Sequence, residues 1–433
     1  MDLTVLNDDC LYHILSKLSV RELIKAELVC KKFYEIIQKV YRGRHLLDFD
    51  EEYKTHPQHK LLKAEMMVII SKVGKHIDTL VASKNCLQID CYKNINELLS
   101  PKFYGATRNL KELSIVGFNM NDSALDRNFF VRIFSKLKTV KLEDCIFLYD
   151  SVLSKCIQEA TDLENIDVCS NDLNGESLQF LRDIKKLNYT YNSVLMNEFI
   201  VKFCENNKAT LKSLHINTTD GENTLIWLKE IVKNLRSLED LTLFVYISYG
   251  ESEETIKEIE DSLTTLGDLP YLTSFSIYLD DDAVNINISV LLMKLLHRNM
   301  LESLDIYYEN EDEETTWKKE AAEIVTKFNN LRVLKYSLED FTDDHLQKIS
   351  SKDSLVIADF IKLNISMKTT TDFINQCPNL QEISVPNVSL DDLQERPKSL
   401  EIFVAASKGP NINDGKRILL NQKNIFLNYN DFY

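Results

Sequence analysis

The sequence has few of the features that mark several common classes of protein. Its 433 residues include only 10 glycines, and neither G-x-x-x-x-G-K-[ST] nor G-x-G-x-x-G occurs, which argues against a phosphate-binding loop. No apolar run approaches the length of a membrane span, and the N-terminus has no signal-peptide pattern. The 9 cysteines form no C-x-x-C pair, so reduced thiols and a cytoplasmic or nuclear location are expected.

Charge and motif content exclude further functions. The formal net charge of -16 would repel a phosphate backbone, so protein partners are expected rather than a nucleic acid. His56 and His59 form an isolated H-x-x-H, which is weak support for a metal site without a third ligand. No hydrolase or metalloprotease motif occurs, so the sequence predicts no catalytic residue, cofactor or metal.

One pattern, Leu-x-x-Leu-x-Leu with substitutions, recurs along most of the chain. A repeat of this length indicates a leucine-rich solenoid, in which each unit stacks on its neighbours. Twelve copies, spaced 20 to 34 residues apart, open at Leu110, Leu137, Leu163, Ile184, Leu211, Leu238, Leu272, Leu301, Leu331, Leu355, Leu380 and Leu400.

Each repeat predicts a short strand, a polar turn and an amphipathic helix. In the copy that opens at Leu163, Ile166 and Val168 should face the core while Asp167 and Cys169 face away. Because a helix is wider than the spacing of strands, the stack should curve, with parallel strands inside and helices outside. The expected fold class is α/β, with domains at 1–45, 46–75 (a helical linker), 76–406 (the solenoid) and 407–433 (a cap or tail).

Polar residues in the turns should satisfy buried backbone groups. Leucine-rich repeats usually place Asn or Cys eight residues after the opening leucine. That position holds Cys145, Asn171, Asn192, Thr219 and Asp280 in five copies, but Phe118, Tyr246 and Glu309 in three others, so the ladder is irregular. In the helix that follows one of these turns, Asp150 is expected to act as a cap.

The first forty-five residues predict three short helices. Asn7, Asp8 and Asp9 precede one apolar run as cap-type residues that place negative charge at the helix start, and Ser19 with Glu22 forms a capping-box pattern before the next. So small a unit buries too little apolar surface to be stable alone, and some of its side chains should await a partner.

This block resembles the F-box, the motif that docks a substrate receptor on the small adaptor of an SCF ubiquitin ligase. Asn7 stands where the family usually has proline, and Phe33 replaces the usual tryptophan. The resemblance implies an adaptor, and through it a cullin, as partners. It assigns adaptor binding to Leu6, Leu11, Ile14, Leu15, Leu18, Leu23, Val29, Cys30 and Phe33.

With its repeats, the chain resembles the leucine-rich-repeat class of F-box proteins. The resemblance implies a non-catalytic receptor that captures a protein substrate for ubiquitination by another subunit. The alternative is a leucine-rich-repeat scaffold or regulator that binds a partner without a ligase, with the N-terminal helices serving only as a cap.

Strand residues that face away from the core are the candidates for substrate binding. Phe244, Tyr278 and Tyr307 share one repeat position and should lie side by side, where an aromatic cluster favours binding. The alternative is that they cover a local apolar gap or pack under the C-terminal tail. Thr242 and Asp305 belong to a parallel polar column. Acidic runs at 251–254 and 309–314 are expected to be solvated turns, although they leave a basic substrate possible.

Overall fold

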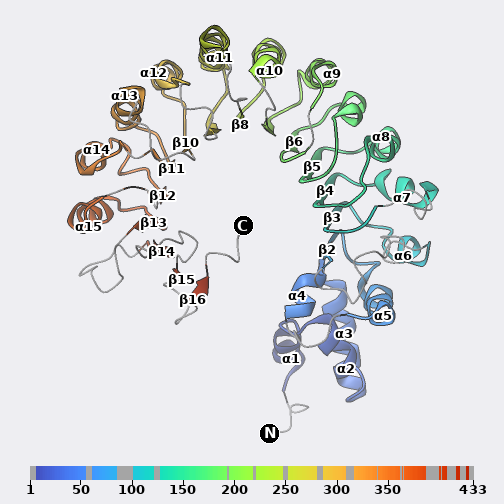
Figure 1. Cartoon of the computed structure of the whole chain (residues 1–433). Coiled ribbons are helices and arrows are strands. Elements are labelled where there is room, and N and C mark those ends of the chain that lie inside the picture. The colour runs from blue at the N-terminus through green and yellow to red at the C-terminus, as the bar shows by residue number, and fades with distance from the viewer. Residues whose placement is uncertain are drawn as a thin grey trace. The chain divides into compact units, whose positions relative to one another are not determined.

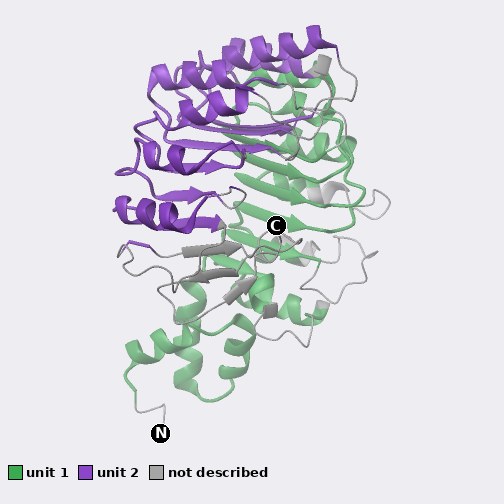
Figure 2. Ribbon diagram, turned by 60° about the vertical axis from the view of Figure 1, so that its left-hand side comes forward, with its two compact units in different colours: residues 1–207 green, residues 208–433 purple. Residues whose placement is uncertain are grey.

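The chain folds into two compact units, residues 1–207 and 208–433 (Figure 2). The computed structural model describes residues 6–54, 61–84, 101–120, 127–192, 195–217, 221–246, 252–279, 286–308, 316–338, 340–360, 363, 365–386, 399–400, 402–406, 416–419 and 426–428. Among those residues no helix is long and apolar enough to cross a membrane.

The first unit starts with three helices and continues as a parallel sheet covered by helices (Figure 1). Its strands pair in sequence order from β1 to β6, each parallel to the next. Its elements are α1 (Asp8–Leu15), α2 (Val20–Ala26), α3 (Lys31–Arg42), β1 (Leu46–Asp48), α4 (Phe49–Lys54), α5 (Lys63–Val73), β2 (Thr79–Ser83), α6 (Pro101–Ala106), β3 (Glu112–Val116), α7 (Arg127–Phe134), β4 (Thr139–Glu143), α8 (Asp150–Glu159), β5 (Asn165–Cys169), the 3-10 helix η3 (Glu176–Phe180), β6 (Lys186–Tyr189) and α9 (Asn197–Asn207).

The second unit repeats the same strand and helix alternation. Strands β7 to β14 are parallel in sequence order, and β15 and β16 add antiparallel pairs after β14. Its elements are β7 (Ser213–Asn217), α10 (Gly221–Asn234), β8 (Asp240–Val245), α11 (Glu253–Leu266), β9 (Ser274–Leu279), α12 (Ser289–Arg298), β10 (Ser303–Tyr308), α13 (Thr316–Val325), β11 (Val333–Tyr336), α14 (Asp343–Lys348), β12 (Ile357–Asp359), α15 (Met367–Gln376), β13 (Glu382–Pro386), β14 (Ile402–Ala406), β15 (Lys416–Leu419) and β16 (Phe426–Asn428).

The strand predictions are confirmed, since each of the twelve repeats contributes one strand, β3 to β14. The core alternation also holds: Ile166 and Val168 are buried, while Asp167 and Cys169 are half-buried on the other face. Two strands that precede these repeats, β1 and β2, were not predicted. Strand β2 follows the same spacing through Ile77, Leu80 and Ala82, where the small alanine weakens the pattern.

The segment expected to be a helical linker, 46–75, contains α4 and α5 but begins with a strand. Strand β1 pairs in parallel with β2, with Leu47 opposite Leu80. Leu47 and Phe49 are buried, so the alternation of core side chains starts directly after the N-terminal helices. The sheet therefore begins at residue 46 rather than at 76.

The turns of the first unit contain a ladder of side-chain amides. The Asn171 side chain accepts a hydrogen bond from the backbone N–H of Cys145 (2.8 Å) and donates to the carbonyls of Leu142 (2.8 Å) and Cys169 (2.9 Å). Asn192 repeats this pattern one repeat later, accepting from the Asn171 backbone N–H (3.0 Å). The predicted role of these residues is confirmed there, whereas Thr219, Asp280 and Glu309 lie outside the described residues.

Helix caps were predicted correctly in the N-terminal helices and incorrectly for Asp150. The Asn7 side chain accepts from the Cys10 N–H, and Ser19 with Glu22 forms the expected capping box. Asp150 does not cap α8, which has no side-chain cap. Its buried carboxylate instead accepts from the backbone N–H groups of Asn174 (2.7 Å) and Ser177 (2.9 Å), in the turn after β5. A partner 24 or more residues away is not visible in a local capping pattern.

Candidate interaction surfaces

The three N-terminal helices pack most of their apolar residues against one another. Leu11, Leu15, Leu23 and Phe33 are each at most 7% exposed, so these four predicted contact residues form the core of the helical block. Leu6, Leu18 and Cys30 are half-buried. A charged residue at any of the four core positions would destabilise the block itself.

The same helices expose an apolar surface around the link between α2 and α3. Leu28 is 87% exposed and Val29 64%, and Ile14 on α1 is 46% exposed. Two aromatic residues, Tyr12 and Tyr34, are also exposed. Val29 and Ile14 were predicted as contact residues, whereas Leu28 was not among the predicted contacts. These residues are the accessible part of the candidate docking surface.

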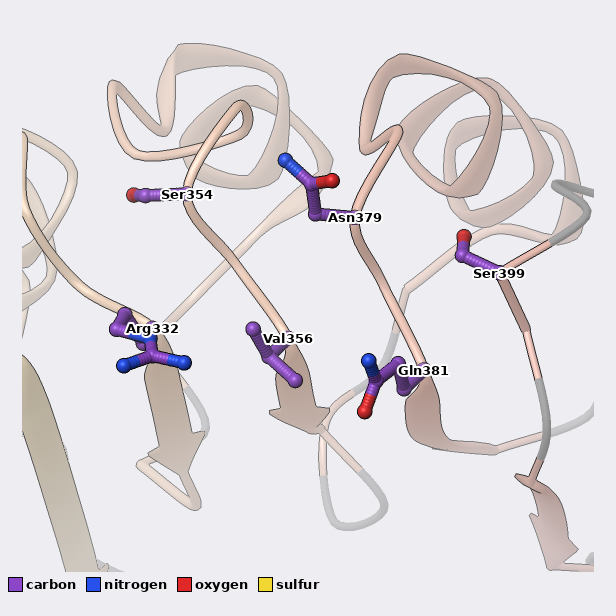
Figure 3. Close-up of a pocket in the computed structure, with 6 residues that line it drawn as sticks. All are labelled: Arg332, Ser354, Val356, Asn379, Gln381 and Ser399. Carbon is purple, nitrogen blue, oxygen red and sulfur yellow. The ribbon is translucent and has the colours of Figure 1, made fainter.

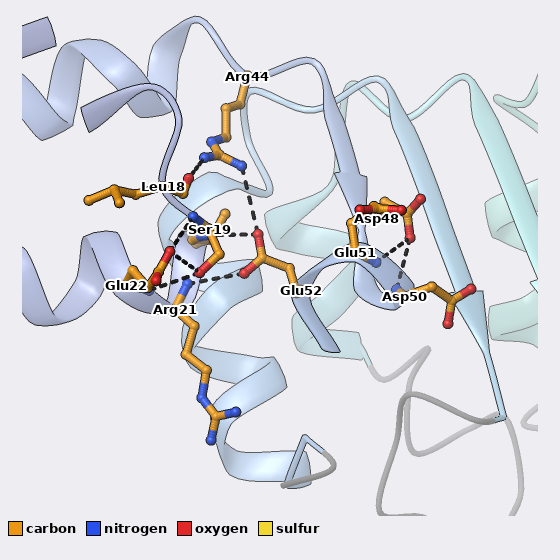
Figure 4. Close-up of polar contacts among 10 residues, drawn as sticks. Leu18, Ser19, Arg21, Glu22, Arg44, Asp48, Asp50, Glu51 and Glu52 are labelled. Atoms are coloured by element: carbon orange, nitrogen blue, oxygen red, sulfur yellow. Dashed lines mark hydrogen bonds and ion pairs between the residues drawn. The ribbon is translucent and has the colours of Figure 1, made fainter. Parts of the chain in front are cut away.

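A buried glutamate joins the helical block to the start of the sheet (Figure 4). Glu52 of α4 is 4% exposed, and its carboxylate accepts from the backbone N–H groups of Val20 (2.7 Å) and Arg21 (3.2 Å) at the first turn of α2. A carboxylate there is stabilised by the helix dipole. Arg44 lies 3.7 Å from Glu52 and donates to the Leu18 carbonyl, so the charge of Glu52 is balanced on both sides.

Two ion pairs connect the block to α5. Arg21 lies 2.6 Å from Glu65, and Lys72 lies 2.6 Å from Glu27, whose side chain is almost fully buried. Together with Glu52, these contacts attach α2 to the first repeats at three points. The block is thus part of the first unit rather than a separately hinged module.

In the second unit, the three predicted aromatic residues lie in register on neighbouring strands. Phe244 pairs with Tyr278 and Tyr278 with Tyr307. The rings of Phe244 and Tyr278 are stacked with centroids 4.4 Å apart, and those of Tyr278 and Tyr307 are 5.7 Å apart. All three are half-buried. We call these three residues the aromatic ladder; its predicted side-by-side arrangement is present.

Asp305 holds the middle ring of the ladder in place. The Tyr278 hydroxyl donates to Asp305 Oδ2 at 2.9 Å, and Lys335 Nζ lies 3.9 Å from the same oxygen. Burial raises the pKa of Asp305, and the nearby Lys335 and the Tyr278 hydrogen bond oppose that rise. Thr242, the remaining predicted contact residue, is 8% exposed and lies two strands away, in register with Ser276 and then Asp305.

A second carboxylate on this face has the opposite electrostatics. Burial alone would raise the pKa of Asp240, but hydrogen bonds from His215, Ser213 and Ser274 outweigh it and lower the pKa to about 2. The His215 ring nitrogen lies 2.9 Å from Asp240 Oδ2 and the Ser213 hydroxyl 2.7 Å. Asp240 is therefore a stable anion.

A shallow pocket of about 440 Å³ lies where the last repeats enter their strands (Figure 3). Figure 3 shows its six residues in two rows: Arg332, Val356 and Gln381 beside the strands, and Ser354, Asn379 and Ser399 beside the helices. The second row links repeats, since Ser354 donates to the Leu331 carbonyl (2.7 Å) and Asn379 to the Asp353 carbonyl (2.7 Å). The pocket contains one charged side chain and no group suited to acid-base chemistry.

Several predicted features lie outside the described residues, namely His56, His59, the acidic run at 309–314 and Glu251. Glu253 and Glu254 are described and occupy the first turn of α11, as expected for residues near a helix start. Within the described part of the chain, no group of three or more His, Cys, Asp or Glu residues could hold a metal ion.

The geometry defines a modular protein, with a small helical domain joined to a leucine-rich-repeat type of parallel α/β sheet. Residues 3–45 match the family model described as the F-box domain. The chain therefore carries an F-box domain at its N-terminus, followed by a sheet like those of leucine-rich repeats. No curated protein matches the sequence.

Several solved structures are similar to this chain, and only the first of those named here has a TM-score above 0.5. Yeast Rad7, in its complex with Elc1, is similar with a TM-score of 0.51 and 18% identity, covering 87% of this chain and 92% of that one. An internalin from Listeria monocytogenes matches with a TM-score of 0.37 and 14% identity, over 73% of this chain and 94% of its own. A leucine-rich-repeat protein of Leptospira interrogans gives 0.36 and 14%, over 79% and 87%. At these identities the likeness to Rad7 concerns the fold alone.

Proposed function

We propose that this chain is the substrate-recognition subunit of an SCF-type ubiquitin ligase. The F-box domain docks on the adaptor, which brings the cullin, and the sheet holds a protein substrate. The observation that carries the docking role is the exposed pair Leu28 and Val29, the two most exposed large apolar residues described in a domain whose core is formed by Leu11, Leu15, Leu23 and Phe33. A leucine with so large an exposed fraction, beside an exposed valine at the link between two helices, is typical of an interface residue.

The aromatic ladder is the proposed substrate contact. Rings that stack on one another and are held by Asp305 lose little side-chain entropy when a partner binds. Aromatic residues at the centre of an interface commonly supply a large share of its binding energy. Phe244, Tyr278, Tyr307 and Asp305 form this surface, and Thr242, two residues before Phe244 on β8, is mostly buried.

No catalytic step is assigned to the chain itself. The proposed gain in rate comes from proximity, because the receptor holds the substrate near a ubiquitin-charged subunit. Rigid attachment of the F-box through Glu52 supports this role, since it fixes the orientation of the first repeats relative to the adaptor. The cysteines among the described residues have free thiols, which is in keeping with action in the cytoplasm or nucleus.

The docking role is tested by charging the exposed pair. Leu28→Asp with Val29→Asp in the full chain should abolish co-purification of the SCF adaptor and cullin, because two carboxylates would be buried in the interface without partners. Circular dichroism should remain unchanged, since both side chains are exposed. Leu15→Asp or Phe33→Asp would not serve, because both residues lie in the core of the domain.

Val68→Asp provides the matched control, because Val68 is 45% exposed on α5, outside the F-box domain. It should leave adaptor recovery at the wild-type level. Recovery that survives the double substitution, or never occurs with the wild-type chain, would favour the alternative of a leucine-rich-repeat scaffold that works without a ligase.

A further inference from the structure

Five large apolar side chains are exposed in the turns after β4 and β6 of the first unit. Isolated exposed apolar residues are common, but a group of them in two turns separated by a single repeat indicates an interaction surface. We call this group the turn patch: Ile146 (43% exposed), Phe147 (43%), Tyr149 (42%), Tyr191 (53%) and Met196 (48%).

Two residues of the turn patch have strained backbones. Phe147 has φ 60° and Tyr191 has φ 55°, in the left-handed region that side chains with a Cβ rarely adopt. Such a conformation costs about 1–2 kcal/mol per residue. At the turn position of Tyr191, the preceding repeats have Gly117, Asp144 and Ser170, also at positive φ. Small or polar residues are the usual solution there, and a tyrosine is not.

The strain is not offset by burial of the rings. Both side chains are close to half exposed, and Phe147 contacts Tyr149 at a ring distance of 6.3 Å. A bulky ring held in an unfavourable backbone and left exposed suggests a use outside the fold.

Hydrogen bonds hold the turns of the patch together. The buried Asp150 carboxylate, next to Tyr149, binds the backbone N–H of Asn174, and the Asn174 carbonyl accepts from the Met196 N–H at 3.2 Å. Gly175, the residue after Asn174, has φ 90°, and a Cβ on it would lie 2.0 Å from Leu195 Cδ1. These contacts connect the turn after β4 to the turn after β5, and that turn to the one after β6, so the backbone that carries Tyr149 and Met196 is ordered before any partner arrives.

The charged residues in and beside these turns are predominantly negative. Exposed carboxylates are supplied by Asp144 after β4, by Asp172 and Glu176 after β5 and by Glu198 in the first turn of α9, whereas Lys84 supplies a cation that pairs with Asp144 at 2.8 Å. Charge complementarity therefore favours a basic partner. Anionic lipid surfaces and nucleic acids would be repelled by the same carboxylates.

We propose that the turn patch docks a protein segment in which apolar side chains are flanked by lysine or arginine. The apolar side chains pack on Phe147, Tyr149 and Met196, and the basic groups face the surrounding carboxylates. This surface belongs to the first unit, and it shares no residue with the aromatic ladder of the second unit or with the exposed pair of the F-box domain. It therefore requires neither the ligase role nor the ladder.

The probe is a phage-displayed library of random peptides of about a dozen residues, selected on the full chain. Enriched peptides should combine apolar anchors with Lys or Arg and should bind more weakly at high salt. Phe147→Asn should weaken the selected peptides about tenfold or more, as loss of a central aromatic contact does. Because asparagine tolerates the left-handed conformation, the melting temperature should stay the same or rise.

Tyr271→Asn is the matched control, because Tyr271 is 56% exposed in the second unit and outside the patch. It should leave binding of the selected peptides unchanged. The proposal is overturned if acidic peptides are enriched, if none is enriched, or if vesicles containing phosphatidylserine bind in a Phe147-dependent manner. A melting temperature that falls in Phe147→Asn would also overturn it, because the ring would then serve the fold.

Discussion

The sheets of the two units share their buried positions but differ at the positions around them. In the first unit, Asn171 and Asn192 use their side chains to join one turn to the next. In the second unit, the repeat position two residues before that of the asparagines carries the aromatic residues Phe244, Tyr278 and Tyr307. The buried leucines, isoleucines and valines set the stacking in both, so the remaining positions are open to either structural or binding roles.

The difference extends to the way turn backbone groups are satisfied. In the first unit, the Asn171 side chain bonds three backbone groups. In the second unit, the residue after β11 is Ser337, two positions earlier in its repeat, which accepts from the Tyr308 backbone N–H at 2.9 Å and donates to the Ile306 carbonyl at 3.3 Å. A hydroxyl is shorter than an amide and bridges fewer groups. The turn of Asn171 should therefore depend more strongly on a single side chain than the turn of Ser337 does.

The largest expected effect is on the asparagine ladder. Asn171→Ala leaves the Cys145 N–H and the Leu142 and Cys169 carbonyls without their side-chain partner, at a site that is 6% exposed. We expect the free energy of unfolding to fall by about 3 kcal/mol, measured by urea denaturation. Asn165→Ala removes one half-exposed hydrogen bond to Thr139 and should cost about 1 kcal/mol or less. Equal losses would refute the special role of the ladder.

The next effect concerns binding in the second unit. Tyr278→Ala should lower substrate capture about tenfold, because it removes the central ring of the ladder and its link to Asp305. Proximity labelling with the proteasome inhibited, followed by quantitative mass spectrometry, measures the captured proteins. Adaptor recovery should be unchanged, since the F-box domain belongs to the first unit. If Tyr278→Ala lowers the stability of the fold as strongly as it lowers substrate capture, the ladder is a packing feature.

Sequence patterns were sufficient for the features that depend on local periodicity. The aromatic ladder could be foreseen because Phe244, Tyr278 and Tyr307 sit at the same offset from a repeat opening, and parallel pairing in register then places them together. The same reasoning found Asn171 and Asn192. It missed β2, where Ala82 replaces a large apolar residue.

Features that depend on tertiary contacts were not foreseeable. Nothing local to Glu52 shows that it reaches the first turn of α2, 32 residues earlier. Leu28 continues the apolar pattern of Leu23, yet Leu28 is 87% exposed and Leu23 is buried, because α2 ends at Ala26 and Leu28 lies in the turn that follows it. The strain at Phe147 likewise has no marker in the sequence, since phenylalanine does not favour its conformation.

The smallest expected effect is on the pH dependence of stability, in which two carboxylates of the second unit, Asp240 and Asp305, should differ. The pKa of Asp240 is lowered to about 2, below the value of about 4 in an unfolded chain, so its charge stabilises the fold above pH 4 and that contribution is lost as the pH falls toward 2. Asp305 has a raised pKa, so its charge costs stability at neutral pH, and the cost disappears as the pH falls through its folded pKa.

The same substitution should therefore act with opposite sign at the two sites. At pH 7, Asp240→Asn should lower the free energy of unfolding, by about 1 kcal/mol or less because the site is partly open to solvent. Asp305→Asn should leave it unchanged or raise it slightly, since the Tyr278 hydroxyl can still donate to the amide oxygen. Urea denaturation at pH 7 and at pH 3 measures both, and the Asp240 effect should shrink at the lower pH. A loss at Asp305 equal to that at Asp240 would mean that Lys335 and Tyr278 outweigh burial, and that they hold the Asp305 carboxylate as firmly as the hydrogen bonds from His215, Ser213 and Ser274 hold Asp240.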